Sequence, residues 1–99
     1  MSIAVRPSFS FNFHADPGHG WLEVSAEQIA EVGLKPTSFS QFSYRRGSKY
    51  FLEEDVDASL FIAAFERIFP KVDIKYVEHF SDNRSFVRDL ERIDFINRM

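Results

Sequence analysis

Polar and aromatic residues alternate without a break over residues 8–13, in the order Ser-Phe-Ser-Phe-Asn-Phe. A period of two is that of a β-strand, and it places the three phenylalanines on one face of a sheet and the polar residues on the other. Residues 16–20, Asp-Pro-Gly-His-Gly, follow as a turn, with a proline that fixes φ and glycines that accept positive φ. Residues 21–24, Trp-Leu-Glu-Val, are then the second strand of a predicted hairpin.

A short helix is predicted directly after this hairpin. Ser25 is a favoured N-cap residue, and Gln28 completes a capping box with it. Ile29 and Val32 form the apolar stripe, and Gly33 stands where a left-handed C-cap residue is expected. Because the helix is only about two turns long, we expect packing to hold it in place.

A second hairpin is predicted from strands at residues 41–45 and 49–53. The turn at residues 46–48 contains Gly47, which supplies the dihedral angles that a tight turn needs. In this pairing, one face of the hairpin carries an aromatic and aliphatic set that consists of Phe42, Tyr44, Tyr50 and Leu52.

The longest helix is predicted to follow, with Asp57 as its N-cap and Pro70 after its end. Val56 before the cap and Phe61 inside the helix form a hydrophobic staple. Apolar residues at i, i+3, i+4 and i+7 place one stripe toward the core, and this stripe consists of Phe61, Ala64, Phe65 and Ile68.

Alternation at residues 72–76 predicts a fifth strand. A last helix is predicted next, with Ser81 or Asp82 as its N-cap. Its inward-facing residues are Phe86, Val87, Leu90 and Ile93. Residues 94–99 are expected to be a frayed tail, with Phe95 and Ile96 able to dock. The order β-β-α-β-β-α-β-α predicts one α+β domain over residues 1–99, with a mostly antiparallel sheet of about five strands and helices packed on one face.

Composition supports this fold and removes several kinds of chemistry. Twelve Phe, three Tyr and one Trp supply most of the core material. The absence of Cys excludes disulfides, thiolate metal ligands and thiol catalysis. Twelve basic and fifteen acidic side chains give a formal charge of −3, which argues against a dedicated nucleic-acid binder. The sequence shows neither a secretory signal nor an apolar run of the roughly 20 residues that span a bilayer, so we expect a soluble, cytoplasmic protein.

Three side chains around the first turn are candidate metal ligands. The imidazoles of His14 and His19 and the carboxylate of Asp16 are ligand types that zinc and other divalent ions accept. The alternative, which we favour, is that Asp16 builds an Asx-turn and the histidines lie at the rim of the hairpin, because no HExxH-type spacing is present. No cofactor is therefore predicted.

The densest charge cluster consists of Glu53, Glu54, Asp55 and Asp57. Between a strand and a helix N-terminus, these carboxylates complement the helix dipole, and Asp57 caps the helix. The others are candidates for an anionic patch that meets a basic partner surface. Binding of Mg²⁺ or Ca²⁺ is a weaker alternative, because the run lacks the Gly and the distal Glu of an EF-hand.

Basic and aromatic residues mix at the tip of the second hairpin. Tyr44, Arg45, Arg46 and Lys49 could hold a single-stranded backbone and stack on bases. Charges at a hairpin end also protect a sheet edge, and we favour this structural role. The sequence shows no glycine-rich phosphate loop and no catalytic residues that we can assign.

Three segments together resemble a family of short, uncharacterised proteins of phages and mobile elements. They are residues 16–24 (Asp-Pro-Gly-His-Gly-Trp-Leu-Glu-Val), 43–47 (Ser-Tyr-Arg-Arg-Gly) and 50–58 (Tyr-Phe-Leu-Glu-Glu-Asp-Val-Asp-Ala). The resemblance covers most of residues 11–88, and Ser-Phe-Val-Arg at 85–88 fits the last helix of the family. The family has no established catalytic residues to transfer.

The resemblance implies a non-enzymatic protein-binding module that inhibits a host complex in the bacterial cytoplasm, most concretely an anti-CRISPR inhibitor. CRISPR effectors expose basic nucleic-acid channels, which an anionic module can occupy. Metal binding and single-stranded nucleic-acid binding remain the alternatives, and a homodimer through an exposed strand edge is possible with each. The expected partner-binding residues are Glu53, Glu54, Asp55, Asp57, His19 and Trp21.

Overall fold

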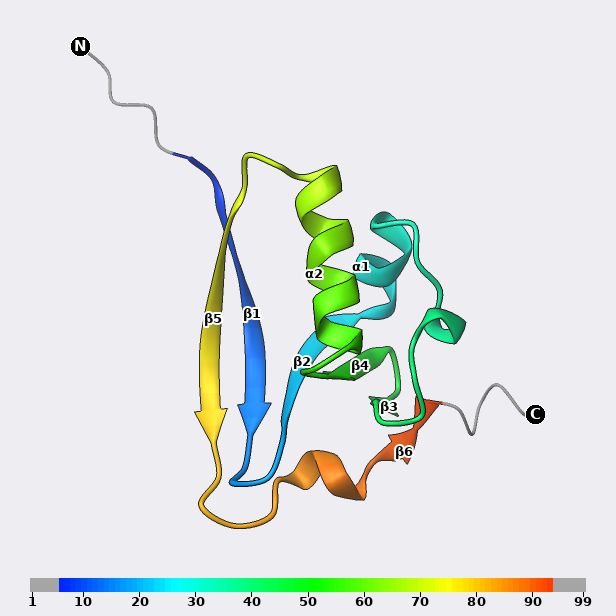
Figure 1. Cartoon of the computed structure of the whole chain (residues 1–99), viewed down its shortest axis with the longest axis vertical. Helices are drawn as coiled ribbons and strands as arrows, with labels where there is room; N and C mark the ends of the chain where they lie inside the picture. The colour runs from blue at the N-terminus through cyan, green and yellow to red at the C-terminus, as the bar shows by residue number, and fades with distance from the viewer. Residues whose placement is uncertain (1–5, 94–99) are drawn as a thin grey trace.

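The computed structural model describes residues 6–93, which form a six-stranded mixed sheet with the strand order β5-β1-β2-β4-β3-β6 (Figure 1). The strands are β1 (Ser8–Ala15), β2 (Gly20–Ser25), β3 (Tyr44–Arg46), β4 (Lys49–Glu53), β5 (Asp73–Phe80) and β6 (Glu91–Arg92). The helices of the described residues are α1 (Ala26–Glu31), α2 (Asp57–Ile68) and the 3₁₀ helices η1 (Pro36–Ser38) and η2 (Phe86–Asp89).

The strand pairings are antiparallel except between β1 and β5, which run parallel. The α+β class and the mostly antiparallel sheet are therefore confirmed, with one strand more than predicted. Since parallel neighbours need a long crossover, β5 reaches β1 only after the chain has passed through β4 and α2 (Figure 1). Within residues 6–93 no helix is long and apolar enough to cross a membrane.

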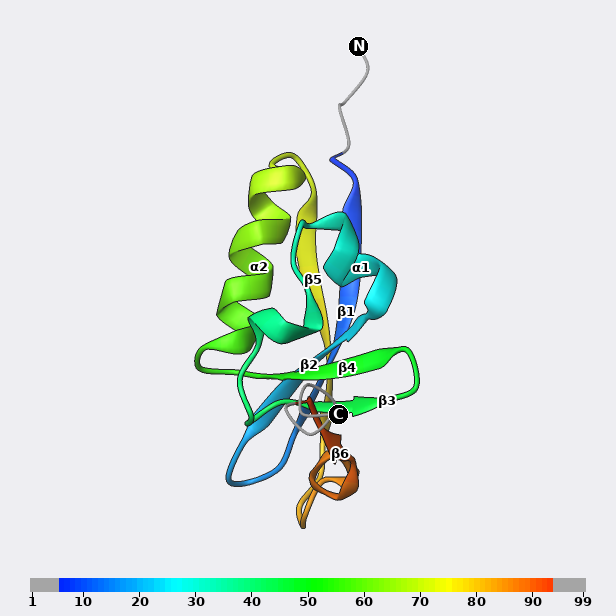
Figure 2. The same ribbon diagram turned by 90° about the vertical axis from the view of Figure 1, so that its right-hand side faces the viewer.

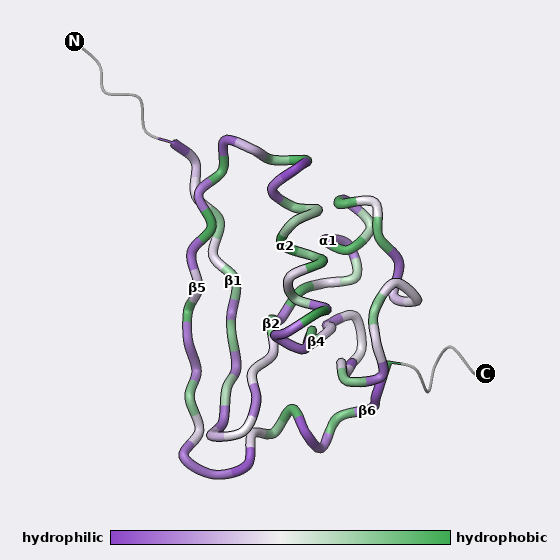
Figure 3. The backbone as a smooth tube through the Cα atoms, in the orientation of Figure 1, coloured by the Kyte–Doolittle hydropathy of each residue, from purple (hydrophilic) through white to green (hydrophobic). Residues whose placement is uncertain are grey.

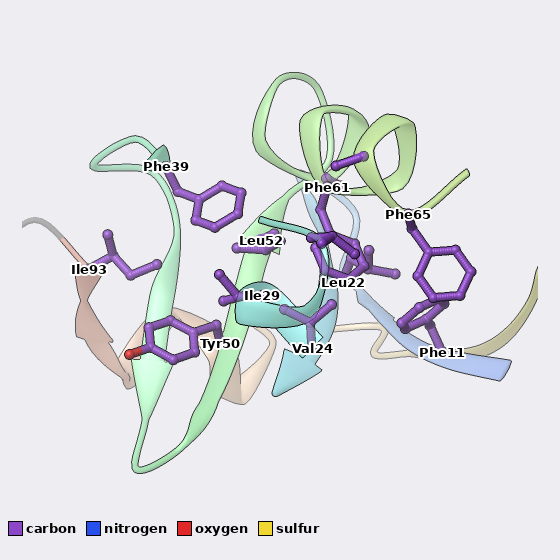
Figure 4. Close-up of a cluster of buried hydrophobic side chains, with 13 residues drawn as sticks. Phe11, Leu22, Val24, Ile29, Phe39, Tyr50, Leu52, Phe61, Phe65 and Ile93 are labelled. Carbon is purple, nitrogen blue, oxygen red and sulfur yellow. The ribbon is translucent and has the colours of Figure 1, made fainter. Parts of the chain in front are cut away.

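Both α-helices cover the same face of the sheet, as predicted, and together they enclose the main core (Figure 2). Phenylalanine rings dominate this core: Phe11 on β1 packs edge-on against Phe61 and Phe65 of α2, with ring centroids 5.6 and 5.4 Å apart. Figure 4 shows these rings beside Leu22 and Leu52 from the central strands. The alternating phenylalanines of the sequence therefore serve as the attachment surface for α2.

The opposite face of the sheet carries a second, smaller cluster. It consists of Trp21, Tyr44, Phe51 and Val87, with Leu90 partly buried beside them. Val87 comes from η2, so this short helix covers the sheet on the side away from α1 and α2. The cluster packs η2 against β2, β3 and β4.

The first hairpin and the first helix form as predicted. Ala15 pairs with Gly20 across the turn, and a Cβ added at Gly20 would lie 2.5 Å from a ring carbon of Phe13, so the ring would have to move. Ser25 caps α1 in a complete capping box with Gln28. These features depend on neighbouring residues, which is why the sequence alone reveals them.

The predicted register of the second hairpin is wrong by one residue. Tyr44 pairs with Phe51, so it lies in the second cluster and not with Tyr50 and Leu52 in the main core. The exposed Phe42 precedes the strand. A two-residue connection sets Arg46 opposite Lys49, and a one-residue change in register moves each side chain to the other face.

The start of α2 also differs from the prediction. Its N-cap is Val56, which makes no side-chain capping bond and is 65% exposed, so the expected staple with Phe61 does not form. Asp57 is the first helical residue and is buried. Of the predicted stripe, Phe61 and its neighbours Ala64 and Phe65 are buried, whereas Ile68 at the helix end is exposed.

The predicted last helix is wrong in form. Ser85, and not Ser81 or Asp82, caps the single 3₁₀ turn η2, after which β6 pairs with β3. The free edge of β3 offers backbone partners that a longer helix would leave unused. Val87 and Ile93 are buried as expected, but Phe86 is exposed. The predicted tail at 94–99, with its Phe95 and Ile96, lies outside the described residues.

Candidate functional site: two hollows beside the acidic turn

The acidic turn, residues 53–57, connects β4 to α2, and two of its carboxylates build the turn itself. Glu53 is 9% exposed and accepts hydrogen bonds from the backbone amides of Asp55 (2.8 Å) and Val56 (3.0 Å). Burial raises the pKa of Glu53, but these amide bonds outweigh that effect, so its pKa is lowered and the group is charged. Glu53 is thus a structural residue of the turn.

Asp57 is the second structural carboxylate. It is 2% exposed and accepts hydrogen bonds from the backbone amide and the hydroxyl of Ser40 and from the hydroxyl of Ser43. The Ser43 hydroxyl is in turn 2.9 Å from the amide of Glu53, from which it accepts a bond. Asp57 therefore ties the loop before β3 to the start of α2 and cannot reach a partner.

Glu54 and Asp55 are the exposed carboxylates of the turn, and each lines a different hollow. The first hollow, here called the acid groove, has a volume of about 540 Å³ and lies between α2 and strands β1, β2 and β5. Its carboxylates come from three elements of the fold and are Glu54, Glu66 and Glu78. The rest of its lining is mostly apolar: Phe13, Leu22, Ala58, Ser59, Ile62, Ala63 and Tyr76.

The acid groove carries a concentrated negative charge. Within residues 6–93, Glu54, Glu66 and Glu78 take part in no ion pair and their carboxylates in no hydrogen bond. Burial, and after it the charge of Glu66, raises the pKa of the Tyr76 hydroxyl. The groove therefore combines an apolar floor with carboxylates that are available to a cationic group.

The second hollow, here called the Trp21 hollow, has a volume of about 500 Å³. It brings together Asp55 and two other predicted contact residues, His19 and Trp21, with Phe42, Tyr44, Glu53, Val56, Arg88 and Arg92. Trp21 is only 3% exposed, because the Arg88 guanidinium lies 5.4 Å from its ring and Tyr44 meets it edge-on. Trp21 forms the floor of this hollow and is not a projecting anchor.

Asp16 is fully engaged in hydrogen bonds within the protein. Its two oxygens accept from Arg88 Nε (2.6 Å) and Nη2 (2.8 Å) and from the amides of Gly18, His19 and Ser85 (2.9, 3.0 and 2.9 Å). The Arg88 guanidinium, together with these amides, holds the pKa of Asp16 far below its usual range. The Asx-turn interpretation is confirmed.

The two histidines of the candidate metal set point into different surroundings. His14 Nε2 is 2.8 Å from a carboxylate oxygen of Glu23, and its ring stacks on His79 with centroids 5.0 Å apart. His19 lies instead in the Trp21 hollow. Within residues 6–93, no group of three or more His, Cys, Asp or Glu side chains that could hold a metal ion is found, and His14, Asp16 and His19 are not brought together.

The basic residues of the second hairpin lie on both faces of the sheet. Arg45 pairs with Glu91 at 2.8 Å, and Lys49 pairs with Glu23 at 3.1 Å. Tyr44 is buried in the second cluster, on the face opposite to Arg45. Arg46 and Lys49 lie opposite each other on the same face as Tyr44, so only Arg45 is separated from the other predicted residues.

Three residues of these hollows were missed by sequence reasoning: Glu66, Glu78 and Arg88. The sequence did not indicate Glu66 or Glu78 as site residues, because an isolated glutamate on a helix or strand is usually a solvent-exposed position without a specific role. Arg88 lies in the Ser-Phe-Val-Arg segment at 85–88, yet its partner Asp16 is 72 residues away along the chain. Long-range contacts bring these side chains to their sites.

Family models, curated proteins and solved structures each show no match to this chain. The geometry described above therefore carries the functional argument.

Proposed function

We propose that this chain is a non-enzymatic protein-binding module whose contact surface is the acid groove. The observation that supports the proposal is the meeting of Glu54, Glu66 and Glu78, none of them ion-paired within residues 6–93, around an apolar hollow of about 540 Å³. Its partner presents a basic segment that also carries apolar side chains.

The chemistry of the groove favours lysine and arginine as the anchoring side chains. Both have aliphatic stems that can cover an apolar floor while their charged heads remain at its rim. In the acid groove the floor includes Phe13 and Ile62, and the carboxylates lie beside it. Charge complementarity of this kind speeds association and rejects acidic competitors.

The first experiment measures binding of a labelled basic amphipathic peptide of alternating lysines and leucines by fluorescence anisotropy. Replacement of Glu54, Glu66 and Glu78 together by Gln should weaken binding at least about tenfold, and added salt should weaken binding to the wild-type protein. The matched control replaces the exposed Glu27, Glu31 and Asp82 by Gln, Gln and Asn. Equal affinity of both triple variants would remove the acid groove as the contact surface.

A CRISPR effector is the most concrete partner, on the basis of the resemblance to proteins of phages and mobile elements. The basic channel of an effector, which holds its nucleic acid, complements the charge of the acid groove. The test adds the protein to a purified effector and measures cleavage of target DNA, with the acid-groove triple Gln variant beside it. Inhibition by the wild type alone supports this partner. No inhibition by either protein excludes that effector and leaves the peptide result standing.

A further inference from the structure

Strand β5 is the outermost strand of the sheet, and among residues 6–93 nothing pairs with its outer edge (Figure 1). It is 8 residues long and contains neither proline nor glycine. Hydrophobic and hydrophilic residues are interspersed along it (Figure 3), and its exposed apolar side chains include Val77 (47%) and Phe80 (64%). A long, regular edge of this kind is a template for another strand.

The backbone groups that point outward can be identified from the pairing with β1. The amide of Asp73 donates to the carbonyl of Pro7 (2.8 Å), and the amide of Ser81 donates to the carbonyl of Ala15 (2.9 Å). In a parallel pair, alternate residues direct both backbone groups to the same neighbour. The odd-numbered residues of β5 therefore face β1, and the outward-facing residues are Ile74, Tyr76, Glu78 and Phe80.

We propose that β5 pairs antiparallel with β5 of a second copy of this chain, about a two-fold axis at Val77. A two-fold axis perpendicular to the sheet makes the interface self-complementary and continues each face of one sheet into the same face of the other. Hydrogen bonds between the two β5 strands form only where residues with outward-facing backbone groups lie opposite each other. The axis must therefore pass through a residue and not between two residues.

In the register centred on Val77, each outward-facing residue of β5 has a favourable cross-strand partner in the second copy. Ile74 lies opposite Phe80 of the second copy, an apolar pair, and Tyr76 lies opposite Glu78, a phenol beside a carboxylate. Val77 meets Val77 on the other face. Cross-strand pairs of these types stabilise antiparallel sheets.

The neighbouring registers are poorer. An axis at Tyr76 sets the apolar Ile74 opposite the charged Glu78 and leaves Phe80 beyond the end of the pairing. An axis at Glu78 sets two carboxylates directly opposite each other, which is destabilising. The side chains of β5 thus select the axis at Val77.

The outer edge of β5 and the acid groove share Tyr76 and Glu78, but the two proposals can be tested separately. Val77 pairs with Asn12 on the sheet face opposite to Tyr76 and Glu78, the groove residues of β5. Substitutions at Val77 therefore test the edge of β5 and leave the lining of the acid groove intact.

The first test measures the mass of the full chain by light scattering and sedimentation equilibrium. The wild-type protein should reach twice the chain mass of 11.6 kDa as its concentration rises toward about 1 mM. Val77→Lys places two like charges at the axis and should raise the dimer dissociation constant at least about tenfold, whereas Val77→Thr should change it less than about threefold.

The second test uses the absence of cysteine among the described residues. In the proposed register the two Val77 Cα atoms form a non-hydrogen-bonded pair about 4.5 Å apart, within the range of a disulfide. Two Lys75 Cα atoms are about 13 Å apart along the strands. Val77→Cys should therefore form a disulfide-linked dimer under mild oxidation, and Lys75→Cys, also on an exposed position of β5, should not.

Each outcome decides the proposal. The proposal is overturned if the wild-type chain stays monomeric throughout the concentration range. It is also overturned if the outer edge of β5 instead binds a strand of a different protein. Faster cross-linking of Tyr76→Cys or Glu78→Cys than of Val77→Cys overturns the register. A Val77→Lys protein that dimerises as strongly as the wild type, with an unchanged circular dichroism spectrum, overturns the interface.

Discussion

At the scale of single residues, the carboxylate of Asp16 joins two segments that are distant in the sequence. It orders the β1–β2 turn through the amides of Gly18 and His19, and it holds η2 through Ser85 and Arg88. Arg88 also covers the ring of Trp21. One buried acidic group therefore shapes the rim of the Trp21 hollow.

Replacement of Asp16 by Ala should lower the free energy of unfolding by about 3 kcal/mol, because a buried amide and a guanidinium lose their acceptor. Urea denaturation followed by circular dichroism measures this change. The exposed Asp82→Ala, from the adjacent loop, is the matched control and should cost less than about 0.5 kcal/mol. Equal stability of the two variants would contradict the role given to Asp16.

The same carboxylate gives the stability a defined dependence on pH. Its pKa is lowered in the folded protein, mainly by Arg88, from an ordinary value of 3.8. As pH falls below about 5, the unfolded chain binds a proton that the folded protein does not, so the free energy of unfolding decreases with falling pH. Asp16→Asn should remove this part of the decrease between about pH 5 and 3. Parallel curves for wild type and variant would show that other groups cause it.

At the scale of elements, the connection between β3 and β4 decides which side chains share a face. Gly47 has a φ of +61°, a left-handed conformation that glycine adopts readily. The two-residue connection sets Tyr44 opposite Phe51 and so assigns Tyr44 to the second cluster. The floor of the Trp21 hollow follows from this short turn.

Gly47→Ala should destabilise the protein by about 1 kcal/mol, and Gly47→Asn by less, because asparagine accepts left-handed φ better than alanine. No atom lies within 4 Å of a Cβ added at this position, so the cost arises from the backbone alone. Thermal unfolding measures it, and Ser48→Ala on the neighbouring exposed residue serves as the control. An alanine variant as stable as the wild type would mean that the turn can take another conformation.

At the scale of the whole molecule, a modest net charge of −3 is unevenly distributed. Glu54, Glu66 and Glu78 come from the acidic turn, α2 and β5, and they line one groove. Elsewhere in the described residues several charged side chains form ion pairs, such as Arg45 with Glu91. Uncompensated like charges in one place are a feature of binding surfaces, where they oppose folding and favour a partner.

The acid-groove triple Gln variant should therefore be more stable than the wild type, by up to about 1 kcal/mol at low ionic strength. The gain should shrink as salt screens the repulsion in the wild-type protein. Urea denaturation at low and high salt measures both effects, and the control triple variant at Glu27, Glu31 and Asp82 should show a smaller gain. A less stable groove variant would mean that these carboxylates support the fold.

Local features were predictable because the residues that create them are neighbours. The Ser25–Gln28 capping box, the Asx-turn of Asp16 and the glycine turn at Gly47 each depend on a few consecutive residues. The predictions failed where a distant partner decided the outcome. Asp57 turned inward to Ser40 and Ser43 instead of capping α2, and the chain after Ser85 paired with β3 instead of continuing as a helix.

The period-two and helical patterns of the sequence determined the α+β class, the first hairpin and the phenylalanine face that receives α2, because hydrophobic burial follows periodicity along the chain. Only the tertiary structure decided that β5 lies parallel to β1, which elements end at a free edge, and which carboxylates gather in the acid groove. Burial acts on one face of an element at a time, whereas the position of an element in the sheet depends on backbone pairing with segments far away in the sequence.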